Sequence, residues 1–330
     1  MSYRKSLSLI LAAVAVFTAS ASPQSAAIAK EAGERPHMDL AFCIDTTGSM
    51  QNEIDMVKNK TKELVAKLST GKPAPIVRVG LVAYRDRGDE YVTKVFQFSD
   101  NIDQVVKDIS DLKAAGGGDG PESVNEGLHV ALNSLAWSKD SHTAKLLFLI
   151  GDAGPHFYPN DYKWEDESKS AISRGIQINT IACSGLEQYA PAQGSDVFKQ
   201  IAKLSDGKYD TLAYRTEIVY ASGKKSTLVT AGGASYRLAA GEKDWKSAAV
   251  AGRLERASAP APATATAMMG AKGAFLARGR AAGGGGFGAA RAALMSDAPA
   301  SAPARSDSNL DEVLLDAARA KAKTSLNVHY

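Results

Sequence analysis

The sequence lacks the motifs that most often mark an enzyme or a nucleotide-binding protein. It contains no phosphate-binding Gly-x-x-x-x-Gly-Lys-Ser/Thr loop, no Gly-x-Ser-x-Gly nucleophile motif and no His-Glu-x-x-His zinc motif. The glycine-rich run at residues 116–120 also lacks the strand and glycine spacing of a dinucleotide-binding turn. We therefore expect a protein without catalytic activity.

Cysteine is scarce, and the charge is nearly balanced. The two cysteines, Cys43 and Cys183, do not form the closely spaced pair that binds zinc. The 39 basic and 36 acidic residues give a formal net charge of +3, which provides no strong field for attracting nucleic acid. A hydrophobic content of 45% is ordinary for a globular protein. We therefore expect a globular chain whose partners do not include nucleic acid.

The N-terminal residues have the pattern of an export signal. Arg4 and Lys5 precede an apolar run that ends in a small-x-small cleavage site, Ala19-Ser-Ala21. The run is shorter than the roughly 20 residues that a membrane-spanning helix needs. We expect residues 1–21 to be a signal peptide and residues 22–36 a linker. The mature protein is then exported, periplasmic or secreted, without a stable membrane anchor.

The most informative stretch is an apolar run that ends in three oxygen-bearing side chains. Residues 38–45 predict a strand buried on both faces, and an amphipathic helix follows from Met50. Asp45, Thr47 and Ser49 lie at the turn between them. Carboxylate and hydroxyl oxygens there suit a hard cation such as magnesium. The alternative is that Asp45 or Thr47 only caps the helix.

Strands and helices alternate after this stretch, which predicts a mainly parallel sheet with helices on both faces. The predicted strands are residues 38–45, 77–84, 91–98, 145–151, 176–183 and 208–213. The predicted helices are residues 50–68, 102–112, with Asp100 as the cap, 124–135, 164–174 and 195–204. The charged turn after the second strand is too short for a crossover, so the third strand should be antiparallel. We interpret Arg85, Asp86 and Arg87 in that turn as solvated charges, with a role in partner specificity at the carboxyl edge as the alternative.

The Asp45-x-Thr47-x-Ser49 pattern resembles the Asp-x-Ser-x-Ser signature of von Willebrand factor A domains, and the resemblance covers residues 37–214. It implies a doubly wound six-stranded sheet of order 3-2-1-4-5-6. Cys43 and Cys183 would then be separated by one strand, roughly 9 to 10 Å apart at a strand spacing of about 4.8 Å. This is too far for a disulfide, so we expect both to be buried and free.

The resemblance also implies a metal-ion-dependent adhesion site. Asp45, Thr47 and Ser49 would begin it, Asp119 stands on the second loop where the family usually has Thr, and Asp152 follows the fourth strand. Clustered carboxylates repel each other by roughly 4 kcal/mol at about 4 Å and a dielectric of 20, and a cation removes that cost. We expect Mg²⁺, with Ca²⁺ or Mn²⁺ as alternatives. His156 could border the same crevice, although a lone loop histidine is the simpler interpretation.

The C-terminal third predicts three further segments. Residues 215–256 read as a small β-rich extension with a hairpin, a third strand and a helix at 242–254. Residues 257–306, rich in Ala, Gly, Pro and Ser, predict a disordered linker. Residues 307–330 predict a capped helix and tail, whose apolar stripe needs a partner or the main domain to cover it.

The combined interpretation is an exported module that captures a protein partner through an acidic side chain bound to its cation. Two alternatives remain at this point. The same metal could activate water in a hydrolase, or it could serve only to stabilise the fold.

Overall fold

The computed structural model describes residues 35–118, 120–186, 191–219, 225–232, 234–238, 244–256 and 304–330. Two predicted segments fall outside this range: the signal peptide, with nearly all of the linker that follows it, and residues 257–303 of the second linker. The chain separates into two units, residues 1–35 and 36–330, and everything below concerns the second.

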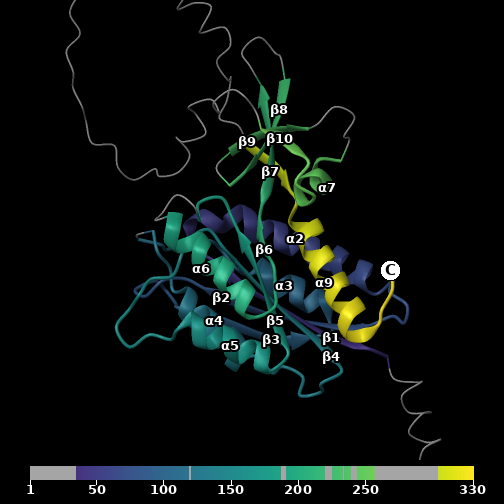
Figure 1. Ribbon diagram of the computed structural model, residues 1–330. Helices are drawn as coiled ribbons and strands as arrows, with labels where there is room; N and C mark the ends of the chain where they lie inside the picture. Colours follow the sequence, from purple (N-terminus) through teal and green to yellow (C-terminus); the bar gives the residue numbers. More distant parts are fainter. Residues whose placement is uncertain are drawn as a thin grey trace, which may run out of the picture. The chain divides into compact units, whose positions relative to one another are not determined.

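A six-stranded sheet forms the centre of the fold (Figure 1). Its order is β3-β2-β1-β4-β5-β6, with β2 and β3 antiparallel and every other pair parallel. The strands are β1 His37–Asp45, β2 Ile76–Tyr84, β3 Thr93–Ser99, β4 Thr143–Gly151, β5 Ile176–Ala182 and β6 Tyr209–Thr211. The apolar runs of β1 and β4 are buried on both faces, as parallel strands between two helix layers must be. The predicted fold class, strand order and antiparallel edge are therefore confirmed.

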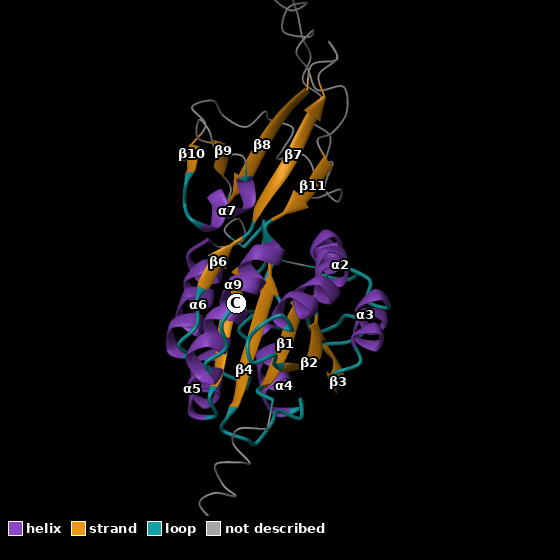
Figure 2. Cartoon of the chain, turned by 90° about the vertical axis from the view of Figure 1, so that its right-hand side faces the viewer, coloured by secondary structure: helices purple, strands orange, loops and turns teal. Residues whose placement is uncertain are grey.

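Helices cover both faces of this sheet (Figure 2). On one face α2 Gln51–Leu68, α3 Ile102–Ser110 and α9 Leu310–Leu326 pack against the sheet. On the other face lie α4 Val124–Asn133, α5 Trp164–Ser173 and α6 Pro191–Leu204. Alternate residues of β1 serve the two cores: Phe42 belongs to the first and Cys43 to the second. Both cysteines are buried and free, as predicted.

Some predicted helix ends were wrong. Asn101, not Asp100, caps α3, because its side chain accepts the N–H of Gln104 at 3.2 Å. A 3-10 turn, η1 Gly48–Met50, precedes α2. The last helix begins at Leu310 rather than residue 307, because a strand occupies the preceding residues.

A second, antiparallel sheet follows the first along the chain, in the order β10-β9-β8-β7-β11. Its elements are β7 Ala213–Val219, β8 Lys225–Ala231, β9 Ala234–Leu238, the short helix α7 Trp245–Val250, β10 Leu254–Arg256 and β11 Ala304–Ser308. The predicted hairpin and third strand are present, and the predicted helix is shorter. Strand β11 overlaps the last three residues of the predicted linker.

The final helix belongs to the core of the first sheet. Leu314 is fully buried in the same cluster as Phe42 and Phe148. The start of α9 is also joined to the second sheet, since Asn309 Oδ1 accepts the N–H of Ala213 at 2.8 Å. The apolar stripe that the sequence predicts is thus covered by the main sheet and α2. None of the helices in the described part of the chain is long and apolar enough to cross a membrane.

If α9 completes this core, truncating one of its buried side chains must destabilise the whole domain. We expect Leu314→Ala to lower the free energy of unfolding by about 2–5 kcal/mol, because the fully buried leucine leaves a cavity. Urea unfolding followed by circular dichroism measures this. Lys323→Ala, at an exposed position of the same helix, should change it by less than about 0.5 kcal/mol. Equal effects of the two substitutions would show that α9 is dispensable to the core.

Candidate metal centre

Asp45 ends β1 at the carboxyl edge of the sheet and is fully buried. Its Oδ1 atom accepts two hydrogen bonds from Thr47, from the N–H at 2.8 Å and from the hydroxyl at 2.7 Å. Its Oδ2 atom is buried and has no hydrogen-bond partner in the described part of the chain. One oxygen therefore fixes the carboxylate, and the other is left for a ligand.

The next two motif residues after Asp45, Thr47 and Ser49, are increasingly exposed to solvent. Thr47 is 2% exposed, and its extended backbone leads into η1. Because its hydroxyl donates its hydrogen to Asp45, the lone pairs of that oxygen point elsewhere and can serve a cation. Ser49 lies on the exposed side of η1. The motif thus runs from a buried carboxylate to a hydroxyl at the surface.

Asp152 comes to the same place from the neighbouring strand. It directly follows β4, which pairs with β1 so that Ile150 lies beside Ile44, and it is 5% exposed. The loop after β5 passes close to it: a Cβ on Gly185 would lie 3.3 Å from Asp152 Oδ2. Gly185 has a φ of +140°, which a residue with a side chain rarely adopts, so this close approach depends on glycine.

The glycine-rich second loop is held against the first motif. Gly117 has a φ of +74°, and a Cβ there would lie 3.1 Å from both Thr47 Cβ and Glu122 Oε1. The N–H of Gly117 donates to both carboxylate oxygens of Asp89, at 3.3 and 3.2 Å. Asp119, the ligand predicted on this loop, lies outside the described residues.

Glu122 is a further candidate ligand that the sequence pattern does not indicate. It is 3% exposed, and its Oε2 atom has no hydrogen-bond partner among the described residues. Its backbone forms two hydrogen bonds with the loop after β4. Its N–H donates to Gly154 O at 3.0 Å, and its carbonyl accepts the His156 N–H at 2.8 Å. In the sequence, Glu122 resembles an ordinary acidic residue before a helix. Only its burial beside Thr47 sets it apart.

The charges after β2 are less solvated than predicted. Arg85 is 3% exposed and donates to the carbonyl oxygens of Thr46 at 3.1 Å and Lys113 at 2.7 Å. Asp86 is 6% exposed and accepts the hydroxyls of Ser123 at 2.8 Å and Tyr158 at 2.6 Å. The interpretation as solvated turn charges was wrong for these two residues, which join the three loops of the site into one network.

Burial makes the acidic side chains of this site hard to ionise. Burial, followed by the nearby Asp152, raises the pKa of Asp45 well above its usual value, although its hydrogen bonds from Thr47 oppose this. Burial, followed by Asp45 and Asp86, raises the pKa of Glu122 to about 10. A divalent cation among these oxygens would offset the repulsion between the carboxylates and favour their ionised forms.

Among the described residues, the candidate ligands of a hard cation are hydroxyl as well as carboxylate oxygens. In the described ranges, no group of three or more His, Cys, Asp or Glu side chains is placed to hold a metal ion. The structure brings together Asp45, Thr47 and Asp152 and adds Glu122, with Ser49 at the exposed edge. The two orphaned carboxylate oxygens, Asp45 Oδ2 and Glu122 Oε2, fit a cation that also binds hydroxyl oxygens.

Comparison with known proteins agrees with this fold. A von Willebrand factor A domain model matches residues 39–213, more than half of the chain. The chain therefore belongs to the von Willebrand factor A domain family, a fold that commonly mediates protein interactions.

Curated relatives share part of this domain. The alpha-protein kinase vwkA of Dictyostelium discoideum is 31% identical over 120 residues, 36% of this chain and 19% of that protein. Human von Willebrand factor A domain-containing protein 7 is 35% identical over 122 residues, 36% of this chain and 12% of that protein. The chain thus spans less than a fifth of the length of these relatives.

Among solved structures, proximal thread matrix protein 1 from the mussel byssus, with a zinc-occupied MIDAS motif, aligns over 53% of this chain and 41% of that chain. The identity is 19% and the TM-score is 0.40.

The raised pKa of Glu122 gives the metal-free protein a defined pH dependence. The folded state keeps the Glu122 proton up to about pH 10, whereas the unfolded chain releases it near the ordinary value of 4.5. The unfolded state binds fewer protons in that window, so the free energy of unfolding falls as pH rises, by up to about 1.4 kcal/mol per unit from this group. We expect Glu122→Gln to reduce this slope, measured by urea unfolding in EDTA between about pH 6 and about pH 9.

The matched control is Glu126→Gln, the same substitution in the first turn of α4 at a half-buried position. It should keep the slope of the wild type. A Glu122→Gln protein with an unchanged slope would contradict the burial of this carboxylate.

Proposed function

We propose that this chain is a non-catalytic module that binds a divalent cation at the candidate metal centre and uses it to hold an acidic side chain of a protein partner. The observation that carries the proposal is the pair of buried carboxylate oxygens, Asp45 Oδ2 and Glu122 Oε2, that lack hydrogen-bond partners within the described structure beside the Thr47 hydroxyl. Buried oxygens of this kind are normally satisfied, so a ligand is the simplest completion.

The residues that would hold the cation are Asp45, Thr47, Ser49, Asp152 and Glu122, with Asp119 from the sequence pattern. A set made only of oxygen atoms favours Mg²⁺, with Ca²⁺ or Mn²⁺ as alternatives. Ser49 is exposed while Asp45 is fully buried, so the protein's own side chains would contact the cation from its buried side. The side near Ser49 is left open to a partner. The bound cation would supply positive charge at that opening, and a carboxylate is the side chain that best complements it.

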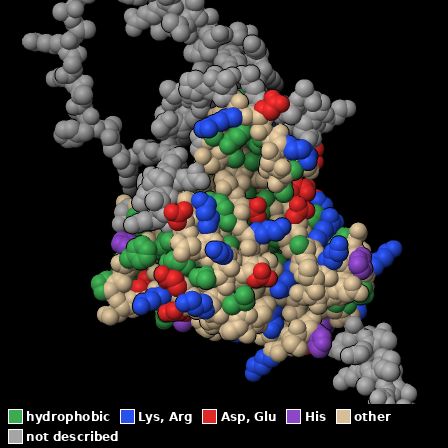
Figure 3. All heavy atoms as spheres, viewed as in Figure 1, with side chains coloured by type: hydrophobic (Ala, Val, Ile, Leu, Met, Phe, Trp, Pro, Cys, Tyr) green, Lys and Arg blue, Asp and Glu red, His purple; other side chains and the backbone are tan. Residues whose placement is uncertain are grey.

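A protein partner fits the rest of the surface better than a nucleic acid. Figure 3 shows basic and acidic side chains interspersed over the face it displays, and the whole sequence has nearly equal numbers of each. The N-terminal pattern of two basic residues, an apolar run and a small-residue cleavage site supports export, so we place the partner in the periplasm or outside the cell.

Cation binding should stabilise the wild-type protein. At about 100 times its Kd, a cation that binds only the folded state raises the free energy of unfolding by about 2.7 kcal/mol. We expect MgCl₂ to raise the melting temperature of the wild type but to have little effect on Asp45→Asn and Thr47→Val, each compared with the same protein in EDTA. Asp166→Ala, which removes an exposed acid from α5, should respond like the wild type. Equal responses in all four proteins would place the cation elsewhere.

Partner capture should depend on a carboxylate as well as on the cation. We expect the wild type to bind members of an immobilised peptide array that contain glutamate or aspartate, and to lose them in EDTA. Binding should also be lost when the acid is replaced by its amide, or when Asp45→Asn is used. A cation-dependent rise in melting temperature without acid-dependent binding would show a structural metal. Hydrolysis of a phosphate or ester substrate that Asp45→Asn abolishes would show an enzyme instead.

A further inference from the structure

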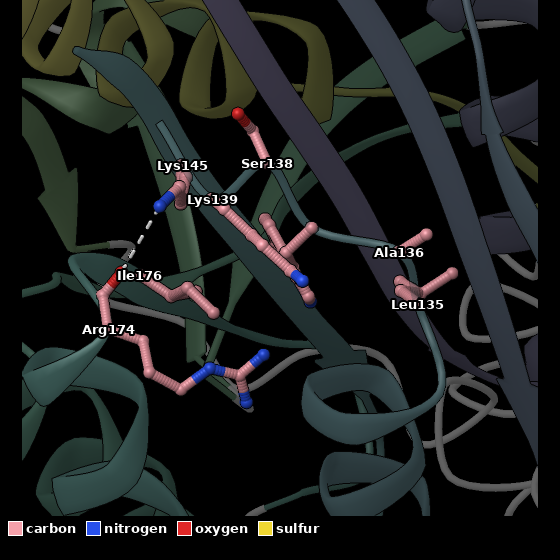
Figure 4. Close-up of a pocket in the computed structure, with 8 residues that line it drawn as sticks. Leu135, Ala136, Ser138, Lys139, Lys145, Arg174 and Ile176 are labelled. Carbon is pink, nitrogen blue, oxygen red and sulfur yellow. Dashed lines mark hydrogen bonds between the residues drawn. The ribbon is translucent and has the colours of Figure 1, made fainter. Parts of the chain in front are cut away.

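A cavity of about 490 Å³ lies at the amino-terminal end of β4 and β5, within the size range of small-molecule sites (Figure 4). Its lining residues are Leu135, Ala136, Trp137, Ser138, Lys139, Lys145, Arg174 and Ile176. Lys145 precedes Asp152 by seven residues along β4, roughly 23 Å at about 3.3 Å per residue. The cavity therefore lies at the opposite edge of the sheet from the candidate metal centre.

Three cations from three segments line this cavity. Lys139 comes from the loop after α4, Lys145 from β4, and Arg174 from the end of α5. Figure 4 shows the side chains of Lys139 and Arg174 extending in the same direction. In the part of the chain that the structure describes, none of the three forms an ion pair with an acidic side chain. This leaves three positive charges around one concave surface without a carboxylate partner.

Lys145 is the most informative of the three, because it is only 7% exposed. Its ammonium group donates to the carbonyl oxygen of Arg174 at 3.4 Å, a long hydrogen bond. An ammonium has three N–H donors, and buried charges in proteins are normally paired. Arg174 donates from Nη1 to Asn133 Oδ1 at 3.3 Å, and no other hydrogen bond of its guanidinium is present among the described residues. Both groups have donors to spare for an anion.

Two acidic residues adjacent to the cavity's lysines in strand register or in sequence, Asp39 and Asp140, already accept hydrogen bonds from other groups. Asp39 lies beside Lys145 in the register of β1 and β4, but its carboxylate accepts Nε and Nη2 of Arg78 at 2.9 and 2.8 Å. It also accepts the N–H of Ser138 at 2.8 Å. Asp140 is exposed, and its carboxylate accepts the N–H of His142 at 2.9 Å. Neither acid neutralises the cavity by direct contact with its cations.

Apart from Ser138, the remaining wall consists of apolar residues. Leu135, Trp137 and Ile176 are each less than a tenth exposed. The indole N–H of Trp137 is taken up by Ala131 O at 2.9 Å, so it adds no hydrogen-bond donor to the cavity. Cationic groups beside an apolar wall suit a ligand that carries an anionic group on an organic body.

We propose that this cavity binds a small phosphomonoester, with its phosphate between Lys145 and Arg174 and its organic part against Leu135 and Ile176. A phosphate ester carries a charge near −2 at neutral pH, which suits three cations better than a single carboxylate does. The planar guanidinium of arginine matches phosphate oxygens geometrically, and lysine binds them as a point charge. Lys139 contributes from the exposed rim.

Calorimetric titration of the full chain with phenyl phosphate, inorganic phosphate and benzoate tests the proposal. The titrations are run in EDTA at fixed ionic strength, so that neither the metal centre nor general screening contributes. We expect saturable binding that is tightest for phenyl phosphate, weaker for inorganic phosphate and weakest for benzoate. Lys145→Met should weaken phenyl phosphate binding about tenfold or more, because it removes a charged hydrogen-bond donor. Lys139→Met, an exposed substitution that leaves the core intact, should weaken it by a smaller factor.

Two control variants separate this site from other effects. Lys169→Met removes an exposed lysine of α5 outside the cavity, and Asp45→Asn alters only the metal centre; both should bind phenyl phosphate like the wild type. The proposal is overturned by the absence of saturable binding, by wild-type affinity in both Lys139→Met and Lys145→Met, or by an equal loss in Lys169→Met. Binding of a poly-glutamate peptide that requires Lys145, without phosphate binding, would overturn it in favour of an acidic protein segment.

Discussion

Repulsion between buried carboxylates at the carboxyl edge of β1 and β4 is the constraint on which the rest of this structure depends. Asp45 is fully buried, and Asp152 and Glu122 are nearly so. Burial and then Asp152 raise the pKa of Asp45, while burial, Asp45, Asp86 and then Asp152 raise the pKa of Glu122. Two such charges about 4 Å apart repel by roughly 4 kcal/mol at an effective dielectric of 20. Because Gly117 and Gly185 have no side chain, the surrounding loops lie close to these carboxylates. A looser loop would admit water to solvate them. This arrangement lowers the free energy of unfolding unless a bound cation neutralises the carboxylates.

The fold compensates for that cost with two large apolar cores, one on each face of the sheet that carries the site. Alternate residues of β1 and β4 are shared between helix layers on the two faces, and α9 completes one layer from far along the chain. The second sheet reaches the same region, since the hydroxyl of Tyr214, at the start of β7, donates to Glu53 Oε1 at 2.8 Å. Glu53 lies in the first turn of α2, four residues after Ser49. One helix therefore supports both the candidate metal centre and the appended sheet.

The sequence predicts what depends on local pattern and fails where tertiary contacts decide. The apolar runs of β1 and β4 predict buried parallel strands, and chain topology then brings Asp45 and Asp152 to one edge. Glu122 could not be recognised in this way, because an acidic residue before a helix has the same local sequence whether it is solvated or buried. Arg85 was misread for a related reason, as its carbonyl acceptors, on Thr46 and Lys113, are far away in sequence. Strand β11, Ala304–Ser308, has no apolar alternation and is defined by its backbone pairing with β7.

The two ends of β4 carry opposite charges, and this separation limits how they can influence each other. Lys145 near its start and Asp152 after its end are roughly 23 Å apart, beyond the Debye length of about 8 Å at physiological salt. Direct electrostatic coupling between an anion at one end and a cation at the other is therefore largely screened. The strand that joins the two ends, β4, is buried along its whole length and hydrogen-bonded on both sides. A strand held in this way has little freedom to shift, so the two ends should act as independent sites.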